Sequence, residues 1–228
     1  MSTSLTIGSF DGLHLGHQKV IKHITQYPTS TLLTFTNHPL SVLPGKTPPK
    51  LLCRLEHKLH LLKQTPITQI LLFPFTPALS QESYDVFLTR IHKTYPFTAL
   101  ILGQGALLGH NREGTPEKLY SLGLHLGFTV TYISPYLYEA VPVSSGRIRN
   151  LVQTGDLYKV KELLGRPYSL YGTLKNGTLD LQGLCHPPPG SYLVSINNCQ
   201  KQAYIENHTL HMPFSCTSPV TVTFTVHG

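Results

Sequence analysis

Charged residues are scarce in this sequence, since Asp, Glu, Lys and Arg together make up only 13% of its 228 residues. Ordinary soluble domains carry about a quarter. Hydrophobic residues make up 40%, which is enough to form a core. This composition excludes a charge-rich disordered chain and predicts a globular protein with one large domain or two small ones.

Cysteine is also rare, and the four cysteines (Cys53, Cys185, Cys199 and Cys216) form no C-x-x-C pair and no metal-binding spacing. Scattered thiols are typical of a reduced, cytoplasmic protein. Residues 1–10 lack the basic and apolar segments of a secretory signal. The longest apolar run, around residues 70–75, is far shorter than the roughly 20 residues that span a bilayer. We therefore expect a cytoplasmic protein that does not enter a membrane.

The net charge is +7, and the whole basic excess lies in residues 1–171. In residues 172–228, Lys175 and Lys201 are balanced by Asp180 and Glu206. A basic surplus predicts an acidic partner, which can be a phosphate compound, a nucleic acid or an anionic membrane. No nucleic-acid-binding motif accompanies the charge, so we expect no nucleic-acid partner.

Short apolar strands and amphipathic helices alternate along the first 164 residues. We expect strands at 5–7, 31–35, 67–73, 99–102 and 128–133, and helices at 16–25, 55–63, 82–94, 116–126, from 145 onward and 156–164. This alternation predicts an α/β domain with a parallel sheet, which binds its ligand at the carboxyl ends of the strands.

The pattern changes after residues 165–167, because no helical periodicity follows. Residues 192–196 and 220–226 alternate as half-buried strands. We therefore expect a first domain at residues 1–168 and a small all-β module at residues 169–228, called the β module below. Its core would be marginal alone, so we expect it to dock on the first domain.

The strongest local signal is G-x-F-D-G-x-H-x-G-H at residues 8–17, between a strand and a helix. Glycines permit close backbone approach, and a helix N-terminus attracts anions. His14 and His17 can then face one phosphate group as donors. A zinc-binding pair and a loop with incidental histidines remain the alternatives.

A second signal is V-S-S-G-R-I-R at residues 143–149. Two hydroxyls at a helix start and two arginines make a second anion-binding site, since arginine binds phosphate oxygens in a bidentate way. Alone, this segment is more typical of a capped helix with solvated arginines; together with the first motif it favours the anion-binding site.

Together, G-x-F-D-G-x-H-x-G-H and S-S-x-R-I-R resemble the nucleotidylyltransferase superfamily, and within it the prokaryotic bifunctional riboflavin kinase/FAD synthetase family. The T-F-T-N-H-P stretch at residues 34–39 and the L-L-G-R-P-Y link at residues 163–168 are similar to further motifs of that family. The resemblance covers about residues 5–172. It implies a Rossmann-like domain followed by a flavokinase-like barrel.

The resemblance implies adenylyl transfer from ATP to FMN, which yields FAD and pyrophosphate, with Mg²⁺ arriving with the triphosphate. By that resemblance the catalytic residues are His14, His17 and Arg149. Further residues that would bind ATP are Gly8, Phe10, Gly16, Ser144, Ser145 and Arg147, and residues that would bind the flavin are Asn37, His38, Gly103 and Gly105. For Arg147 a surface role is an equal alternative, and for His38 a role as a loop histidine. Asp11 would orient the turn or contact a metal-bound water, and no protein side chain is expected to hold a metal ion directly.

The sequence departs from the family at three places. Residues 105–109 read G-A-L-L-G where the family usually has D-F-x-F-G, and Gly146 stands in place of a threonine. The kinase motif with P-T-A-N is missing after Gly172, and the chain stops before the family's usual C-terminal helix. We therefore expect the β module to be a degenerate, shortened kinase remnant, without riboflavin kinase activity.

Two other hypotheses stay open. The altered segment at residues 105–108 is compatible with an adenylyl- or cytidylyltransferase that acts on another phosphorylated metabolite. A non-catalytic nucleotide- or flavin-binding protein is the other alternative, although the retained His14, His17 and Arg149 argue against it.

Overall fold

The computed structural model describes residues 2–226, which form two compact units. The first unit is built from residues up to 10, 16–48 and 62–136, and the second from 11–15, 49–61 and 137 onward. Compactness therefore groups residues 137–168 with the β module. The boundary at residue 168 follows the loss of helical periodicity in the sequence instead, and it stays a prediction.

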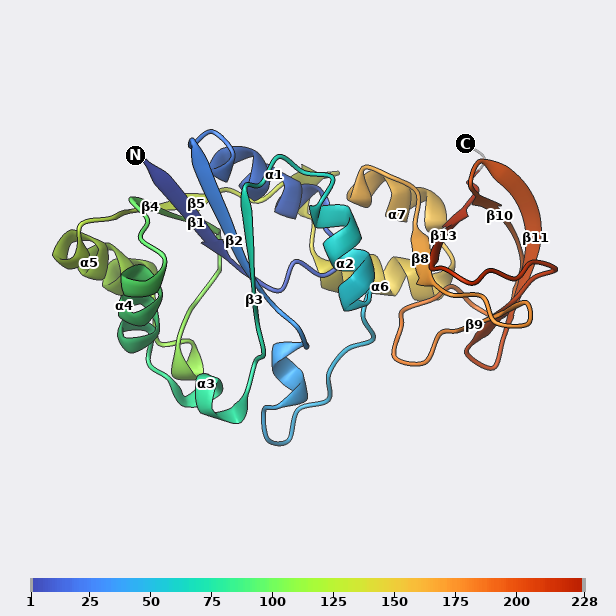
Figure 1. Ribbon diagram of the computed structural model, residues 1–228, viewed down its shortest axis with the longest axis horizontal. Helices are drawn as coiled ribbons and strands as arrows, with labels where there is room; N and C mark the ends of the chain where they lie inside the picture. Colours follow the sequence, from blue (N-terminus) through green and yellow to red (C-terminus); the bar gives the residue numbers. More distant parts are fainter. Residues whose placement is uncertain (1, 227–228) are drawn as a thin grey trace. The chain divides into compact units, whose positions relative to one another are not determined.

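A five-stranded parallel sheet forms the centre of the first unit (Figure 1). The strands are β1 (Thr3–Ile7), β2 (Thr29–Phe35), β3 (Gln69–Phe73), β4 (Ala99–Gly103) and β5 (Thr129–Ile133), in the order β3-β2-β1-β4-β5. Four residues of β1 and six of β2 are buried, as expected for strands covered on both faces. The predicted parallel α/β sheet is confirmed.

The helices of this unit are α1 (Leu15–Ile24), α3 (Pro77–Gln81), α4 (Tyr84–Thr94) and α5 (Pro116–Leu126). Because α1 leads from β1 to β2 and α5 leads from β4 to β5, right-handed crossovers place them on opposite faces of the sheet. Figure 1 shows this arrangement. Helix α3 was not predicted, although Thr76 caps it and Pro77 occupies its first turn. Two short 3₁₀ turns complete the unit, η1 (Pro39–Ser41) and η2 (His110–Arg112).

In the second unit, helices α2 (Leu55–Leu62), α6 (Ser145–Thr154) and α7 (Leu157–Leu164) accompany a small hairpin of β6 (Leu137–Tyr138) and β7 (Val141–Pro142). The Ser144 and Asp156 side chains accept from backbone N–H groups three residues ahead, so they cap the starts of α6 and α7.

The β module forms a six-stranded antiparallel sheet in the order β8-β13-β10-β11-β12-β9. Its strands are β8 (Ser169–Gly172), β9 (Thr178–Asp180), β10 (Gly190–Ile196), β11 (Cys199–Glu206), β12 (Thr209–His211) and β13 (Val220–Phe224). Strand β11 escaped sequence analysis because Lys201 shares a face with the buried Ala203 and Ile205. The predicted all-β module is confirmed.

The β module shares one hydrophobic core with α6 and α7. Ile148 of α6 and Val160 of α7 are fully buried in the same cluster as Val194, Ile205 and Val222 of the sheet. This agrees with the expectation that the module does not stand alone. Among residues 2–226, no helix combines the length and the apolarity needed to cross a membrane.

Candidate functional site

The loop after β1 adopts an unusual backbone. Phe10, Gly12 and Leu13 have φ angles of 49°, 79° and 44°, in the left-handed region. A Cβ atom on Gly12 would lie 2.7 Å from Leu52 Cδ1, so only glycine fits there. Left-handed conformations at non-glycine residues cost about 1–3 kcal/mol each. Other contacts must therefore hold this loop in place.

Asp11 supplies the first set of those contacts and is itself only 5% exposed. Its carboxylate accepts from the backbone N–H of Leu52 at 3.0 Å and of Cys53 at 3.1 Å. It also pairs with Arg149 Nη2 at 2.7 Å. Because backbone and guanidinium donors engage the carboxylate, the geometry supports the interpretation in which Asp11 orients the turn.

Arg149 joins three segments of the second unit. Besides its pair with Asp11, its Nε donates to the Lys50 carbonyl at 2.8 Å. The side chain is only 15% exposed, so the ion pair is shielded from water. Arg149 therefore fixes the start of α6 to the loop and to residue 50, with part of its guanidinium left to meet a ligand.

Arg166, which sequence analysis had assigned only to a family link, holds the same loop. Its Nη2 donates to the Gly12 carbonyl at 2.7 Å, and its Nη1 to the Leu13 carbonyl at 3.2 Å. Among residues 2–226, no carboxylate pairs with it, and burial lowers its pKa. No sequence motif marks this role, because the contact joins residues 154 positions apart.

His14 lies in the second unit and is 6% exposed. Burial is the main cause that lowers the pKa of His14 to about 4. The negative charge of Asp11 opposes this shift, and the positive charges of Arg166 and Arg149 add to it. The imidazole is therefore neutral at pH 7 and donates one hydrogen bond. His17 belongs to the first unit, where its ring lies 5.1 Å from that of Phe10. In the part of the chain that the structure describes, no three His, Cys, Asp or Glu side chains gather as a metal site.

The start of α6 places the predicted hydroxyls. Ser144 Oγ accepts from the Arg147 N–H at 3.2 Å, and Ser145 Oγ donates to the Asp11 carbonyl at 2.9 Å. Arg147 Nη1 donates to the carbonyls of Tyr138 and Val141, each at 3.1 Å. Arg147 thus fastens the β6–β7 hairpin, which favours its structural role over an anion-binding one.

Positive charge exceeds negative charge around this loop. Asp11 is the acidic group here, whereas Arg149, Arg166 and Lys58 are cationic; Lys58 is only 7% exposed, and burial lowers its pKa. Buried charges are costly unless they are paired. Arg149 is paired with Asp11, whereas Arg166 has no carboxylate partner among residues 2–226. An anion next to the loop would offset the charge of Arg166, so the arrangement is suited to bind phosphate groups.

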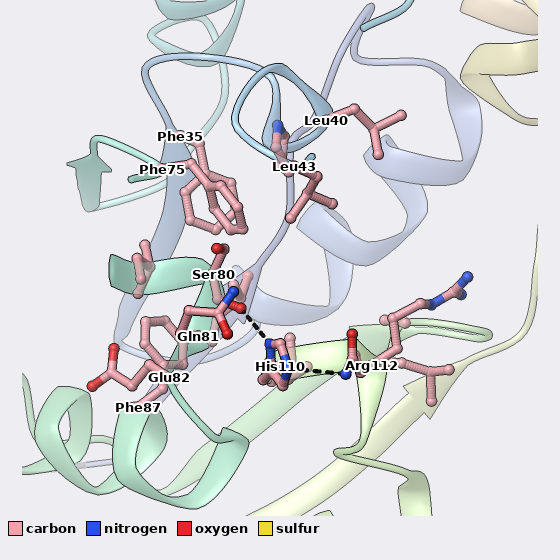
Figure 2. A pocket seen from close by; sticks show the side chains of 18 of the residues that line it. Phe35, Leu40, Leu43, Phe75, Ser80, Gln81, Glu82, Phe87, His110 and Arg112 are labelled. Carbon is pink, nitrogen blue, oxygen red and sulfur yellow. Dashed lines mark hydrogen bonds between the residues drawn. The ribbon is translucent and has the colours of Figure 1, made fainter. Parts of the chain in front are cut away.

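The first unit holds a separate feature, a cavity of about 800 Å³ at the carboxyl ends of its strands. Apolar side chains dominate its walls, among them Leu40, Leu43 and Phe87. The Phe35 and Phe75 rings meet edge to face at 5.1 Å, and Figure 2 shows them together on one wall. An apolar cavity with aromatic walls is suited to a flat ring system.

The polar side of the cavity comes from η2. His110 Nδ1 lies 3.0 Å from the Ser80 carbonyl and donates to it, so Nε2 accepts from Asn111 Nδ2 at 2.9 Å (Figure 2). Lys46 and Arg112 add positive charge to the lining. The cavity therefore combines apolar walls with cationic groups.

The residues predicted to bind flavin lie beside this cavity. Asn37 exchanges two hydrogen bonds of 2.9 Å with the Phe75 backbone and so supports its wall. His38 caps η1 by accepting from the Leu40 N–H. Gly103 is the last residue of β4, and a side chain on Gly105 would meet open space. Residues 106–109, which belong to the segment that differs from the family pattern, line the cavity directly. Of the residues predicted to bind ATP, Gly8 also lines the cavity, and Gly16 lies in the first turn of α1.

Comparison with known proteins gives a consistent result. The family model for FAD synthetase matches residues 1–147. The bifunctional riboflavin kinase/FMN adenylyltransferase of Haemophilus influenzae is 31% identical over 183 residues, 76% of this chain and 58% of its own length. The protein of the same name from Escherichia coli is 28% identical over 182 residues, again 76% of this chain and 57% of its own length. The chain thus spans less than two thirds of the curated relatives it matches.

One solved structure is similar over nearly the whole chain. The crystal structure of a macrolide-efflux protein from Streptococcus pneumoniae matches with a TM-score of 0.80, covering 98% of this chain and 84% of that one. At 20% sequence identity, this likeness supports the fold alone.

Proposed function

Because the chain belongs to the FAD synthetase family, we propose that it transfers the adenylyl group of ATP to FMN, forming FAD and pyrophosphate. The observation that carries this proposal is the positive charge of Arg149 and Arg166 beside the loop of residues 11–14. That loop is built from the family's phosphate-binding motif, and two half-buried arginines face one carboxylate there, that of Asp11.

In the proposed reaction, an oxygen of the FMN phosphate attacks the α-phosphorus of ATP. A new P–O bond forms, the bond between the α-phosphorus and the bridging oxygen breaks, and pyrophosphate leaves with the electron pair. No protein nucleophile is needed, so the residues act by positioning and by stabilising charge. His14 and His17 donate to the phosphates, and Arg149 with the start of α6 holds the leaving pyrophosphate.

Mg²⁺ enters this proposal with the triphosphate. The Asp11 carboxylate already accepts from Leu52, Cys53 and Arg149, so it is a poor metal ligand. Mg²⁺ usually keeps several waters and binds through substrate phosphates. Its contribution would be to neutralise charge on the β- and γ-phosphates.

The cavity of the first unit would bind the flavin ring. Phe35 and Phe75 supply aromatic surface, and Lys46 and Arg112 supply charge for an anionic acceptor. We propose that the chain lacks riboflavin kinase activity, because the segment after Gly172 contains no P-T-A-N motif. A cytoplasmic location remains part of the proposal.

A second candidate keeps the reaction and changes the acceptor. Ala106, Leu107 and Leu108 line the cavity where the family usually has a polar residue and aromatic rings. This favours an acceptor that is phosphorylated but less dependent on polar contacts there than FMN.

The test is to incubate the protein with Mg-ATP and FMN, and separately with Mg-ATP and riboflavin, and to resolve the flavins by chromatography. We expect FAD from FMN and no product from riboflavin. No FAD from FMN would contradict the proposed acceptor, and FMN formed from riboflavin would contradict the claim about the β module.

A matched pair of variants checks the phosphate role. His17→Ala should lower turnover by about 10²-fold or more, since it removes a donor to the transferred group. His23→Ala, on the same helix α1, should keep wild-type turnover. Equal activity of the two variants would contradict the role given to His17.

A further inference from the structure

The L-L-G-R-P-Y segment at residues 163–168 joins α7 to the β module, and the proposed reaction gives it no task. Two of its side chains nevertheless reach back to the phosphate-binding loop and the segment that supports it. We propose that Arg166 and Tyr168 are positioning residues for this loop, and that the β module serves adenylyl transfer as its scaffold. This inference rests on the proposed function.

Arg166 controls the direction of two peptide groups. Its guanidinium binds the carbonyls of Gly12 and Leu13. In a trans peptide the C=O and the following N–H point in opposite directions. Fixing these carbonyls therefore aims the N–H groups of Leu13 and His14 away from Arg166. The loop has left-handed φ angles here, so it depends on such contacts to keep its shape.

Tyr168 acts one step further back. It is 2% exposed, and its hydroxyl lies 2.6 Å from the Cys185 carbonyl and 3.1 Å from the Leu52 carbonyl. The Leu52 carbonyl belongs to the same peptide group as the Cys53 N–H, which donates to the Asp11 carboxylate. Tyr168 thus connects a carbonyl of the β module to the peptide that holds the central carboxylate of the loop.

Backbone pairing reinforces the same connection. The Leu51 N–H donates to the Gly183 carbonyl at 2.9 Å, and the Cys185 N–H donates to the Leu51 carbonyl at 2.7 Å. Residues 51–53 therefore lie as a short connector with the β module on one side and Asp11 on the other. The β module thus binds the connector, the connector donates to Asp11, and Asp11 pairs with Arg149.

The acceptors of Arg166 indicate which part of the unit it serves. They are the carbonyls of Gly12, Leu13 and Leu164, so they belong to the loop and the end of α7 rather than to strands β8–β13. A residue kept only to stabilise a kinase remnant would have no reason to hold the phosphate-binding loop.

The test compares conservative variants with matched controls in the same unit. Arg166→Lys keeps the positive charge but loses the planar guanidinium that binds two carbonyls at once. Tyr168→Phe keeps the aromatic ring but loses the hydroxyl. Arg54 also donates to two carbonyls, those of Asp180 and Gln182, but touches no residue of the loop, so Arg54→Lys is the control for Arg166. Tyr192, whose hydroxyl donates to the Pro188 carbonyl, provides Tyr192→Phe as the control for Tyr168.

The measurements are kcat, KM for ATP, FMN affinity by flavin fluorescence, and melting temperature, with turnover assayed well below all melting temperatures. We expect Arg166→Lys to lower kcat/KM for ATP by about 10- to 100-fold, and Tyr168→Phe by about 3- to 10-fold, with FMN affinity within twofold of wild type. Both controls should keep kcat/KM within twofold, even where they lower the melting temperature.

The inference is overturned if Arg166→Lys matches Arg54→Lys in kcat/KM for ATP, or if FMN affinity falls in parallel with it. Failure of the proposed function looks different, because the wild-type protein itself would then form no FAD. In that case the ATP dissociation constant, measured by equilibrium dialysis, decides the inference: Arg166→Lys must weaken it and Arg54→Lys must not.

Discussion

The cavity of the first unit and the loop of the second unit achieve recognition by different physical means. The cavity is mainly apolar, and most of its walls come from the segments that follow β2, β3 and β4. The loop is held by hydrogen bonds that the Asp11 carboxylate accepts and that Arg149 and Arg166 donate. Apolar walls tolerate exchange among residues of similar size, whereas a buried charge that loses its partner is expensive.

One departure from the family pattern lies in the cavity, and another, Gly146, lies in the first turn of α6. Residues 106–108 line the apolar cavity and have changed, while Asp11, His14 and Arg149 of the polar network match the family motifs. In the proposed reaction, charge would dominate the binding of the phosphates, and shape would dominate the binding of the acceptor.

The largest expected effect comes from removing a charge of the loop. Arg149→Ala leaves Asp11 without its partner at 2.7 Å and should lower kcat/KM for ATP by about 10²- to 10³-fold. FMN affinity should stay within twofold of wild type. Steady-state kinetics and flavin fluorescence measure the two quantities.

Arg147→Ala is the matched control for Arg149→Ala. Arg147 lies two residues away and holds carbonyls of the β6–β7 hairpin, so its loss should lower kcat/KM for ATP less than tenfold. Equal losses for the two arginines would show that the ion pair with Asp11 is not what distinguishes Arg149.

A charge placed in the cavity should have the opposite selectivity. Leu108→Asp puts a carboxylate among apolar walls and near an anionic acceptor, which should raise the FMN dissociation constant by about 10²-fold. The ATP dissociation constant should not change. Leu124→Asp, at a side chain that is 87% exposed, is the matched control and should leave both constants unchanged. Loss of ATP binding in Leu108→Asp would contradict the proposal that the cavity binds FMN and the loop binds ATP.

Buried histidines make the second unit sensitive to acid. Burial is the main cause that lowers the pKa of His14 and of His57 to about 4, from an ordinary value of 6.5. Between pH 6.5 and 4 the unfolded chain binds more protons than the folded one, so the free energy of unfolding falls as the pH falls. Each histidine contributes about 1.4 kcal/mol per pH unit in this window.

His57→Gln tests that slope. His57 is 3% exposed, and glutamine keeps a polar group near Ser169. Urea unfolding at several pH values should give a shallower loss of stability for this variant than for wild type, with the curves parallel above pH 7. The exposed His125→Gln should reproduce the wild-type slope. An unchanged slope in His57→Gln would contradict the role given to its burial.

The smallest effect concerns the thiols. Burial raises the pKa of Cys53 to about 12 and that of Cys185 to about 11, so both stay protonated and unreactive at pH 8. Cys199 is exposed. Brief alkylation followed by peptide mass analysis should find label on Cys199 and none on Cys53, without loss of turnover. Label on Cys53 in the folded protein would contradict the burial of the loop.

Local signals in the sequence sufficed for much of the fold. The Ser144 and Asp156 caps, the strand-rich apolar runs and the glycine-rich motif each depend on neighbouring residues. Helix α3 was missed because its five residues are too few to show periodicity. Strand β11 was missed because Lys201 shares a face with the buried Ala203 and Ile205 and so interrupts the alternation of apolar and polar residues.

The candidate site was harder to predict because its contacts are not local. The sequence identified His14 and Arg149 as candidates, but it gave no sign that Arg166 holds the Gly12 carbonyl across 154 residues. It assigned Asn37 to the flavin, which stays a prediction, and gave no sign that the Asn37 amide is bound to the Phe75 backbone. Distant contacts of this kind depend on the assembled fold.

The most direct test of the central claim follows the adenylyl group itself. ATP radiolabelled at the α-phosphorus is incubated with Mg²⁺, FMN and the protein, and the products are separated. We expect the label to move into FAD and pyrophosphate to be released unlabelled in equal amount. Label that stays in ATP, although ATP and FMN both bind, would contradict it.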